Sequence, residues 1–119
     1  MKREESILKE KSEAFSKRIV RLYKYLTQQK DETIISKQIY RSGTSIGANI
    51  AESKFAQSPP DFISKLSIAL KEANETKFWL GRLYSAENLT DEEYSSIRDD
   101  NEEIIKLLTS ITGTVKKSG

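Results

Sequence analysis

The chain has 119 residues, enough for one folded domain with its own core, and it contains neither cysteine nor histidine. This composition excludes disulfides and thiolate chemistry, and it removes the commonest catalytic base and the commonest metal ligand. The formal net charge is +2, and no apolar run approaches the roughly 20 residues of a membrane span, so we expect a cytoplasmic protein without a signal peptide.

Two helices are predicted in the first half of the chain, over residues 4–29 and 33–55. Their large apolar residues recur at spacings of three, four or seven, which places them on one face of a helix. The stripe of the first helix consists of Leu8, Phe15, Ile19, Leu22 and Leu26. The stripe of the second helix consists of Ile35, Ile39, Ile46 and Ile50.

Two further helices are predicted, over residues 59–87 and 91–115. Ser58 is a suitable N-cap for the third helix, and Thr90 with Glu93 forms a capping box for the fourth. The stripe of the third helix consists of Phe62, Leu66, Ala69, Ala73, Thr76, Leu80 and Leu83. The stripe of the fourth consists of Tyr94, Ile97, Asn101, Ile104, Leu108, Ile111 and Val115.

Short connections between the four predicted helices make sequential neighbours antiparallel. The sequence therefore predicts an all-α fold, an up-down-up-down four-helix bundle that forms a single domain over residues 1–119. Asn101 lies on the core stripe of the fourth helix, where a buried polar residue can set the register of packing.

The two ends of the chain differ in charge. Residues 1–30 contain nine basic and four acidic residues, whereas residues 91–119 contain four basic and seven acidic residues. On one interpretation these segments are neighbouring helices that neutralise each other. On the other, a basic face binds a partner. Lys17, Arg21 and Lys24 would form a ridge on its outer side, and they are the candidate nucleic-acid contact.

Residues 41–52, RSGTSIGANIAE, place two glycines inside the second predicted helix. Each glycine costs an exposed helix about 1 kcal/mol relative to alanine, so the segment is a helix break, a ligand loop or a close contact. A phosphate-binding loop needs a Gly-Lys-Ser/Thr ending and a preceding strand, which are missing here. A break is disfavoured because Ile39 and Ile46 stay in phase. We therefore interpret the segment as a continuous helix.

On a helical wheel, this segment presents three further faces beside its isoleucine stripe. One edge consists of Gly43, Gly47 and Ala51. The other edge consists of Gln38, Ser42 and Asn49, and the residues that point away are Arg41, Ser45 and Glu52. Because Ala69, Ala73 and Thr76 make the middle of the third helix small as well, we predict that the glycine edge packs tightly against the third helix.

The chain carries more large apolar residues than one bundle interior requires. The third helix has such residues on both sides of its core stripe. The alternatives are ordinary edge packing and an apolar face left for a subunit interface. The candidate interface residues are Ile63, Leu70, Trp79 and Tyr84.

Enzymatic activity is not expected from this residue set. Catalysis without histidine or cysteine would depend on carboxylates, lysine or tyrosine. Glu72 and Glu75 are three residues apart, but a di-iron bundle also needs inward Glu-x-x-His motifs, which this chain cannot form. We therefore expect no catalytic residue, no cofactor and no metal site.

One motif and several shorter ones after it resemble a known family. The motif is IYRSGTSIGANIAE at residues 39–52, and the shorter ones lie at residues 61–62, 68–69, 71–73, 75–76 and 79–80. Together they resemble the 23S rRNA intervening-sequence protein family, bacterial four-helix-bundle proteins of which some are encoded within insertions in rRNA genes. The resemblance covers about residues 15–110. Ser53 stands where many relatives have glycine, and their basic run after that point is missing.

The resemblance implies a homopentameric ring of bundles. It also implies kinship with the accessory variability determinant protein of diversity-generating retroelements, a basic pentamer that binds a reverse transcriptase and nucleic acid. The leading hypothesis is a non-enzymatic, homo-oligomeric scaffold or adaptor. The alternative is an RNA- or DNA-binding accessory protein that acts through the basic ridge, with a reverse transcriptase as its protein partner.

Overall fold

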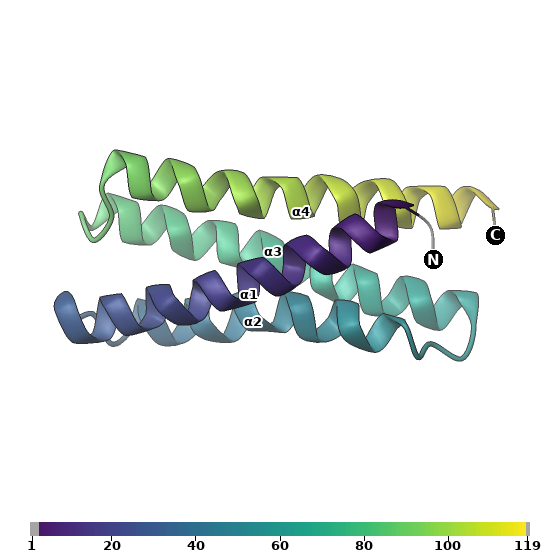
Figure 1. Ribbon diagram of the computed structural model, residues 1–119, viewed down its shortest axis with the longest axis horizontal. Helices are drawn as coiled ribbons and strands as arrows, with labels where there is room; N and C mark the ends of the chain where they lie inside the picture. The colour runs from purple at the N-terminus through teal and green to yellow at the C-terminus, as the bar shows by residue number, and fades with distance from the viewer. Residues whose placement is uncertain (1–2, 119) are drawn as a thin grey trace.

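The computed structural model describes the backbone of residues 3–118 and the side chains of residues 3–113. It contains four helices, α1 (Arg3–Gln29), α2 (Ile35–Ser53), α3 (Pro59–Ser85) and α4 (Asp91–Ser118). They run up, down, up and down in an elongated bundle of 46 × 22 × 19 Å (Figure 1). The predicted all-α fold is confirmed. No helix in the described part of the chain is long and apolar enough to cross a membrane.

Helices α3 and α4 begin at side-chain caps that were recognisable in the sequence. The Ser58 hydroxyl accepts a hydrogen bond from the Asp61 N–H at 3.2 Å, which caps α3 as predicted. In the capping box of α4, the Thr90 N–H donates to Glu93 Oε1 at 2.8 Å and the Glu93 N–H donates to Thr90 Oγ1 at 3.1 Å. These bonds satisfy N–H groups that the first helical turn leaves without partners.

Helix α2 is shorter than the sequence predicts, beginning at Ile35 and ending at Ser53. Its start is set by Glu32, whose carboxylate accepts hydrogen bonds from the N–H groups of residues 34, 35 and 36 at 2.6–3.1 Å. Helix α3 also ends earlier, at Ser85, because Glu87 takes a left-handed conformation with φ of 62°. Such a residue ends a helix in the way a C-terminal glycine does.

The predicted apolar stripes form the core, and most of their members are buried. The buried large members of the stripes are Leu8, Phe15, Ile19, Leu26, Ile39, Ile46, Ile50, Leu66, Leu80, Leu83, Ile97, Ile104, Leu108 and Ile111, and Leu89, in the turn before α4, is buried with them. Leu22 and Tyr94 pack against this core while half-buried. The side chain of Val115 lies outside the described residues.

Asn101 is fully buried in the core, on the stripe where the sequence placed it. Its side-chain amide donates to the main-chain oxygen of Ala73 on α3 at 3.0 Å. Because a buried amide is costly without this bond, the contact fixes the axial position of α4 against α3. This geometry is consistent with the role in register that the sequence suggested.

The glycines of α2 pack against α1, and the prediction that they face α3 is wrong. A Cβ atom on Gly43 would lie 2.8–2.9 Å from side-chain carbons of Ile19. One on Gly47 would lie 2.6 Å from Ser16 Oγ and 3.5 Å from the Ser12 carbonyl oxygen. The opposite edge of α2 faces α3 instead. The antiparallel register predicts which residues of α2 and α3 lie at the same height along the bundle axis. It does not determine which edge of α2 faces α1 and which faces α3.

The contact between Gly43 and Ile19 generates a stability prediction. Gly43→Ala should lower the free energy of unfolding by about 1–3 kcal/mol, because Ile19 is β-branched, buried and unable to yield without strain. Urea unfolding measures the effect. The matched control is Gly81→Ala on α3, where a Cβ would meet nothing within 4 Å, and this change should stabilise the helix by up to about 1 kcal/mol. A Gly43→Ala variant as stable as the wild type would contradict the close contact.

Candidate functional site

The motif RSGTSIGANIAE lies in the middle and C-terminal half of α2, between α1 and α3. Ser42 and Gly43 are buried, whereas Arg41, Ala51 and Glu52 are exposed. Ser45 and Asn49 form side-chain hydrogen bonds within α2. The Ser45 hydroxyl donates to the Arg41 carbonyl at 2.7 Å, and the Asn49 amide donates to the Ser45 carbonyl at 2.9 Å.

Arg41 joins α2 to α3 through two carboxylates. Its guanidinium donates to Glu72 Oε2 at 2.9 Å and also to Glu75 Oε2. Trp79 donates to the same Glu75 oxygen through its indole Nε1 at 3.1 Å. The Glu72 side chain is only 11% exposed, so Arg41 supplies the charge that this carboxylate needs in a largely desolvated place.

Two further contacts hold the motif against α3. The hydroxyl groups of Ser42 and Thr76 lie 2.9 Å apart in a buried pair, and Lys65 forms an ion pair with Glu52 at 3.4 Å. The motif therefore contacts α1 through its glycines and α3 through its polar residues. Sequence reasoning found the motif residues and missed their partners, because the helical wheel pointed Arg41 and Glu52 away from the bundle.

Arg41, Glu72, Glu75 and Trp79 form a cluster, the Arg41 cluster, whose side chains serve as a structural contact between α2 and α3. Both of its carboxylates accept hydrogen bonds from Arg41, and one also accepts from Trp79. Among residues 3–113, no group of three or more acidic side chains is placed to hold a metal ion. The cluster has neither an activated nucleophile nor a free base that could act on a substrate.

The basic ridge of α1 lies beside a second set of cations that the bundle neutralises. Lys11 forms an ion pair with Glu103 at 2.6 Å, and Arg18 with Asp100 at 2.7 Å, which connects α1 to α4. The hydrogen bond with Glu103 raises the pKa of Lys11. The interpretation that the first and last helices neutralise each other is therefore correct on the side of α1 that faces α4.

Lys17, Arg21 and Lys24 are exposed, and none has an ion-pair partner within the part of the chain that the structure describes. Lys24 lies at the edge of a groove between α1 and α2 that Lys37 and Tyr40 also line. In this groove the rings of Tyr23 and Tyr40 lie 4.9 Å apart. Sequence reasoning missed the contribution of α2, because Lys37 and Tyr40 join the ridge only when the two helices pack.

The four candidate interface residues of α3 make part of their contacts within the bundle itself. Ile63, Leu70 and Trp79 are half-buried. Tyr84 stacks on Tyr94 of α4 with ring centroids 4.4 Å apart, and its hydroxyl donates to Asp91 at 2.6 Å. Trp79 instead belongs to the Arg41 cluster beside α2, so these residues do not form one continuous patch.

Other apolar side chains are more exposed than these candidates. Phe55 is 83% exposed, Ile34 is 76% exposed and Phe78 is 55% exposed, while Ile68 and Tyr40 are each 41% exposed. Phe55 and Ile34 lie in the turns that flank α2. Helical periodicity does not identify these two residues, because they lie outside the predicted core stripes. A large apolar residue beside a polar turn is the sequence feature that could have indicated them.

Fold and motif together define a small four-helix-bundle protein whose distinctive sequence lies in its second helix. The model of the 23S rRNA-intervening sequence protein family matches residues 4–110, and the chain belongs to this family. No protein of curated function matches the chain.

A crystal structure of a protein from Bacteroides thetaiotaomicron is similar to this chain along nearly its whole length. It is described as a protein with unknown function from the S23 ribosomal protein family. The two chains are 55% identical, the match covers 92% of this chain and 98% of the other, and the TM-score is 0.91. The likeness supports the fold and the family and leaves the biochemical role open.

The Arg41 cluster predicts a pH dependence of stability. Hydrogen bonds from Arg41 and Trp79 lower the pKa of Glu75 below its ordinary value of 4.5. Because the pKa is lower in the folded state, the contribution is complete above this value and is lost as the pH falls through the folded pKa. Glu75→Gln should cost up to about 1 kcal/mol at neutral pH and less at acidic pH.

Urea unfolding of both proteins at pH 7 and pH 3 measures this difference. Glu87→Gln serves as the matched control, because Glu87 is exposed and its side chain has no hydrogen-bond or ion-pair partner among the described residues. A difference between wild type and Glu75→Gln that is equal at both pH values would show that the ionised carboxylate does not stabilise the fold.

Proposed function

We propose that this protein is a non-enzymatic, homo-oligomeric scaffold or adaptor, and that it forms the pentamer implied by its family resemblance. The observation that carries the proposal is the set of large apolar side chains left exposed on a small bundle, above all Phe55 and Ile68. Contiguous apolar surface marks interaction sites in proteins that are otherwise well packed, and we infer that Phe55 and Ile68 belong to one such surface. The lack of histidine and cysteine supports a role without catalysis.

The outer face of α2 and α3 is the surface best suited to such an interface. The Arg41–Glu75 and Lys65–Glu52 pairs fix the antiparallel register of these helices, which places Ala48 level with Ile68. Both residues are exposed, as is Ala51 one turn further along α2. Small residues at this position allow a helix of another subunit to approach closely, and Phe55 and Ile68 provide the apolar area. Of the motif, Ala48 lies on this face together with the exposed residues Arg41 and Glu52, which pair with α3.

Solution mass tests the oligomer. Light scattering should give a mass of about five times the 13.6 kDa chain for the wild type. Ile68→Glu should reduce this mass without unfolding the chain, because Ile68 is exposed and a charge is costly at an apolar interface. The matched control Ile34→Glu changes an exposed isoleucine at the other end of the bundle and should leave the mass unchanged. A wild-type protein that is monomeric at all concentrations would refute the proposal.

A second candidate function is binding of RNA or DNA through the basic ridge, as an accessory protein to a reverse transcriptase. The observation that favours it is the contrast on α1 between paired Lys11 and Arg18 and the ridge of Lys17, Arg21 and Lys24, which has no ion-pair partner among the described residues. Cations without internal partners are free to contact phosphates, and an oligomer would repeat the ridge in each subunit.

Salt dependence tests this second candidate. Binding of single-stranded RNA and DNA should weaken steeply between low and moderate salt, because binding to phosphates releases counterions. Replacing Lys17, Arg21 and Lys24 by glutamine should reduce the slope of log K against log salt by about 0.7 for each phosphate that is no longer neutralised on a single strand. The control replaces Lys65, Lys71 and Lys77 of α3 and should keep the wild-type slope. Equal slopes for both triple variants, or no binding at low salt, would exclude the ridge.

A further inference from the structure

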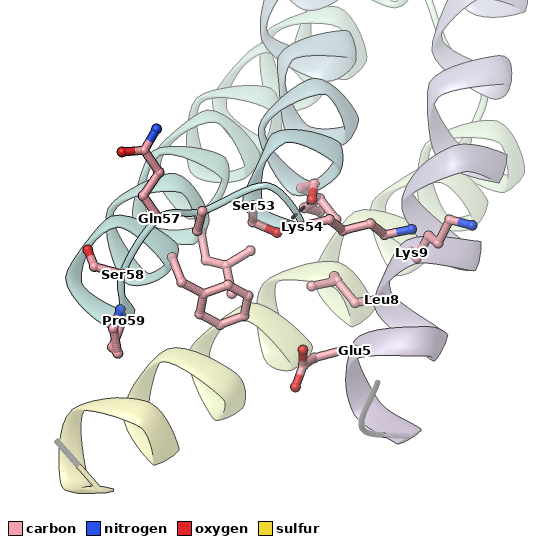
Figure 2. Close-up of a pocket in the computed structure, with 12 residues that line it drawn as sticks. Glu5, Leu8, Lys9, Ser53, Lys54, Gln57, Ser58 and Pro59 are labelled. Atoms are coloured by element: carbon pink, nitrogen blue, oxygen red, sulfur yellow. Dashed lines mark hydrogen bonds between the residues drawn. The ribbon is translucent and has the colours of Figure 1, made fainter.

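A cavity of about 610 Å³ lies at the end of the bundle where the turn between α2 and α3 meets the first turns of α1 (Figure 2). Its floor is apolar, since Leu8, Ile50 and Leu66 are buried core residues, and Phe62 forms part of its wall. The volume falls within the range of about 300–1,000 Å³ that is typical of small-molecule sites. The cavity is therefore large enough and apolar enough to hold an aliphatic chain.

Two lysines from different elements meet at the mouth of this cavity. Figure 2 shows the amino groups of Lys9, on α1, and Lys54, in the turn after α2, side by side above Leu8. Desolvation lowers the pKa of Lys54 and the neighbouring Lys9 lowers it further, while Glu13 acts in the opposite direction. Glu13 lies 3.8 Å from Lys9 in an exposed pair, and Glu5 lines the other side of the cavity.

Both serines that line the cavity have hydrogen-bond partners within the chain, and Figure 2 shows the Gln57 side chain directed away from the cavity. The Ser53 hydroxyl donates to the Ile50 carbonyl at 2.6 Å, and the Ser58 hydroxyl accepts from the Asp61 N–H at 3.2 Å. Helix α3 begins with two prolines, which have no N–H to offer a ligand. The two ammonium groups are thus the donors best placed for a ligand in the cavity, and an anion between them would relieve their repulsion.

We propose that this cavity binds a linear amphiphile, an aliphatic chain that ends in a carboxylate. The chain lies over Leu8, Phe62 and Leu66, and the carboxylate accepts hydrogen bonds from Lys9 and Lys54 at the mouth. Apolar contact provides most of the affinity, and the charged head group provides orientation and selectivity. The cavity lies apart from the basic ridge, and it adjoins the outer face of α2 and α3 at Phe55, whose chain neighbours Lys54 and Ala56 line it. The proposal rests on the cavity alone and not on either proposed function.

Titration calorimetry of the full chain with decanoate tests this site. Decanoate should bind saturably with one molecule per chain, whereas acetate, which lacks the chain, should not bind. Decanol, which lacks the charge, should bind about tenfold more weakly or worse, because a charge-assisted hydrogen bond is absent. Equal affinity for decanol and decanoate would overturn the proposal, and so would the absence of saturable decanoate binding.

Variants separate the two halves of the site. Replacing Lys9 and Lys54 together by glutamine should weaken decanoate about tenfold or more and leave decanol unchanged. Ala56→Trp, in the turn that lines the cavity, should fill the space and abolish binding of both. Lys71→Gln, on the exposed side of α3, is the matched control and should bind like the wild type. With folding verified by circular dichroism, normal decanoate binding by either cavity variant would refute the assignment.

Discussion

The close approach of α1 to α2 is the constraint on which the rest of the bundle depends. It is made at Gly43 and Gly47, where a Cβ atom would lie within 3 Å of side chains on α1. Glycine is unfavourable inside a helix, so its presence here reflects the contact it permits. With α1 seated in this way, the opposite edge of α2 is left for α3, where polar residues complete the packing.

Polar contacts then determine how the helices align along the bundle axis. Apolar stripes pack well at several axial positions, whereas a buried hydrogen bond is satisfied at one. The hydroxyl pair of Ser42 and Thr76 positions α2 against α3, and Asn101 with the Ala73 carbonyl positions α4 against α3. The seam between α1 and α4 is different, because exposed ion pairs connect it, and such pairs contribute little to stability.

The helices, their caps and most of the core follow from local sequence. Periodic apolar residues and the caps at Ser58 and Thr90 depend on neighbours within a few positions, so they can be read without knowledge of the tertiary structure. The partner of Gly43 could not be read in this way, because it depends on how α2 is rotated within the bundle. For the same reason, the sequence did not reveal that Arg41 reaches α3 or that Lys54 meets Lys9.

The central claim is that the family motif acts first as a packing element, with its glycines held against Ile19 and its neighbours on α1. A double-mutant cycle between Gly43→Ala and Ile19→Ala measures this contact most directly. We predict strong coupling: Gly43→Ala should cost clearly less in the Ile19→Ala background, where the obstructing side chain is absent, with a coupling energy of about 1 kcal/mol or more. Additive effects of the two substitutions would show that Gly43 and Ile19 do not contact each other and would contradict the account.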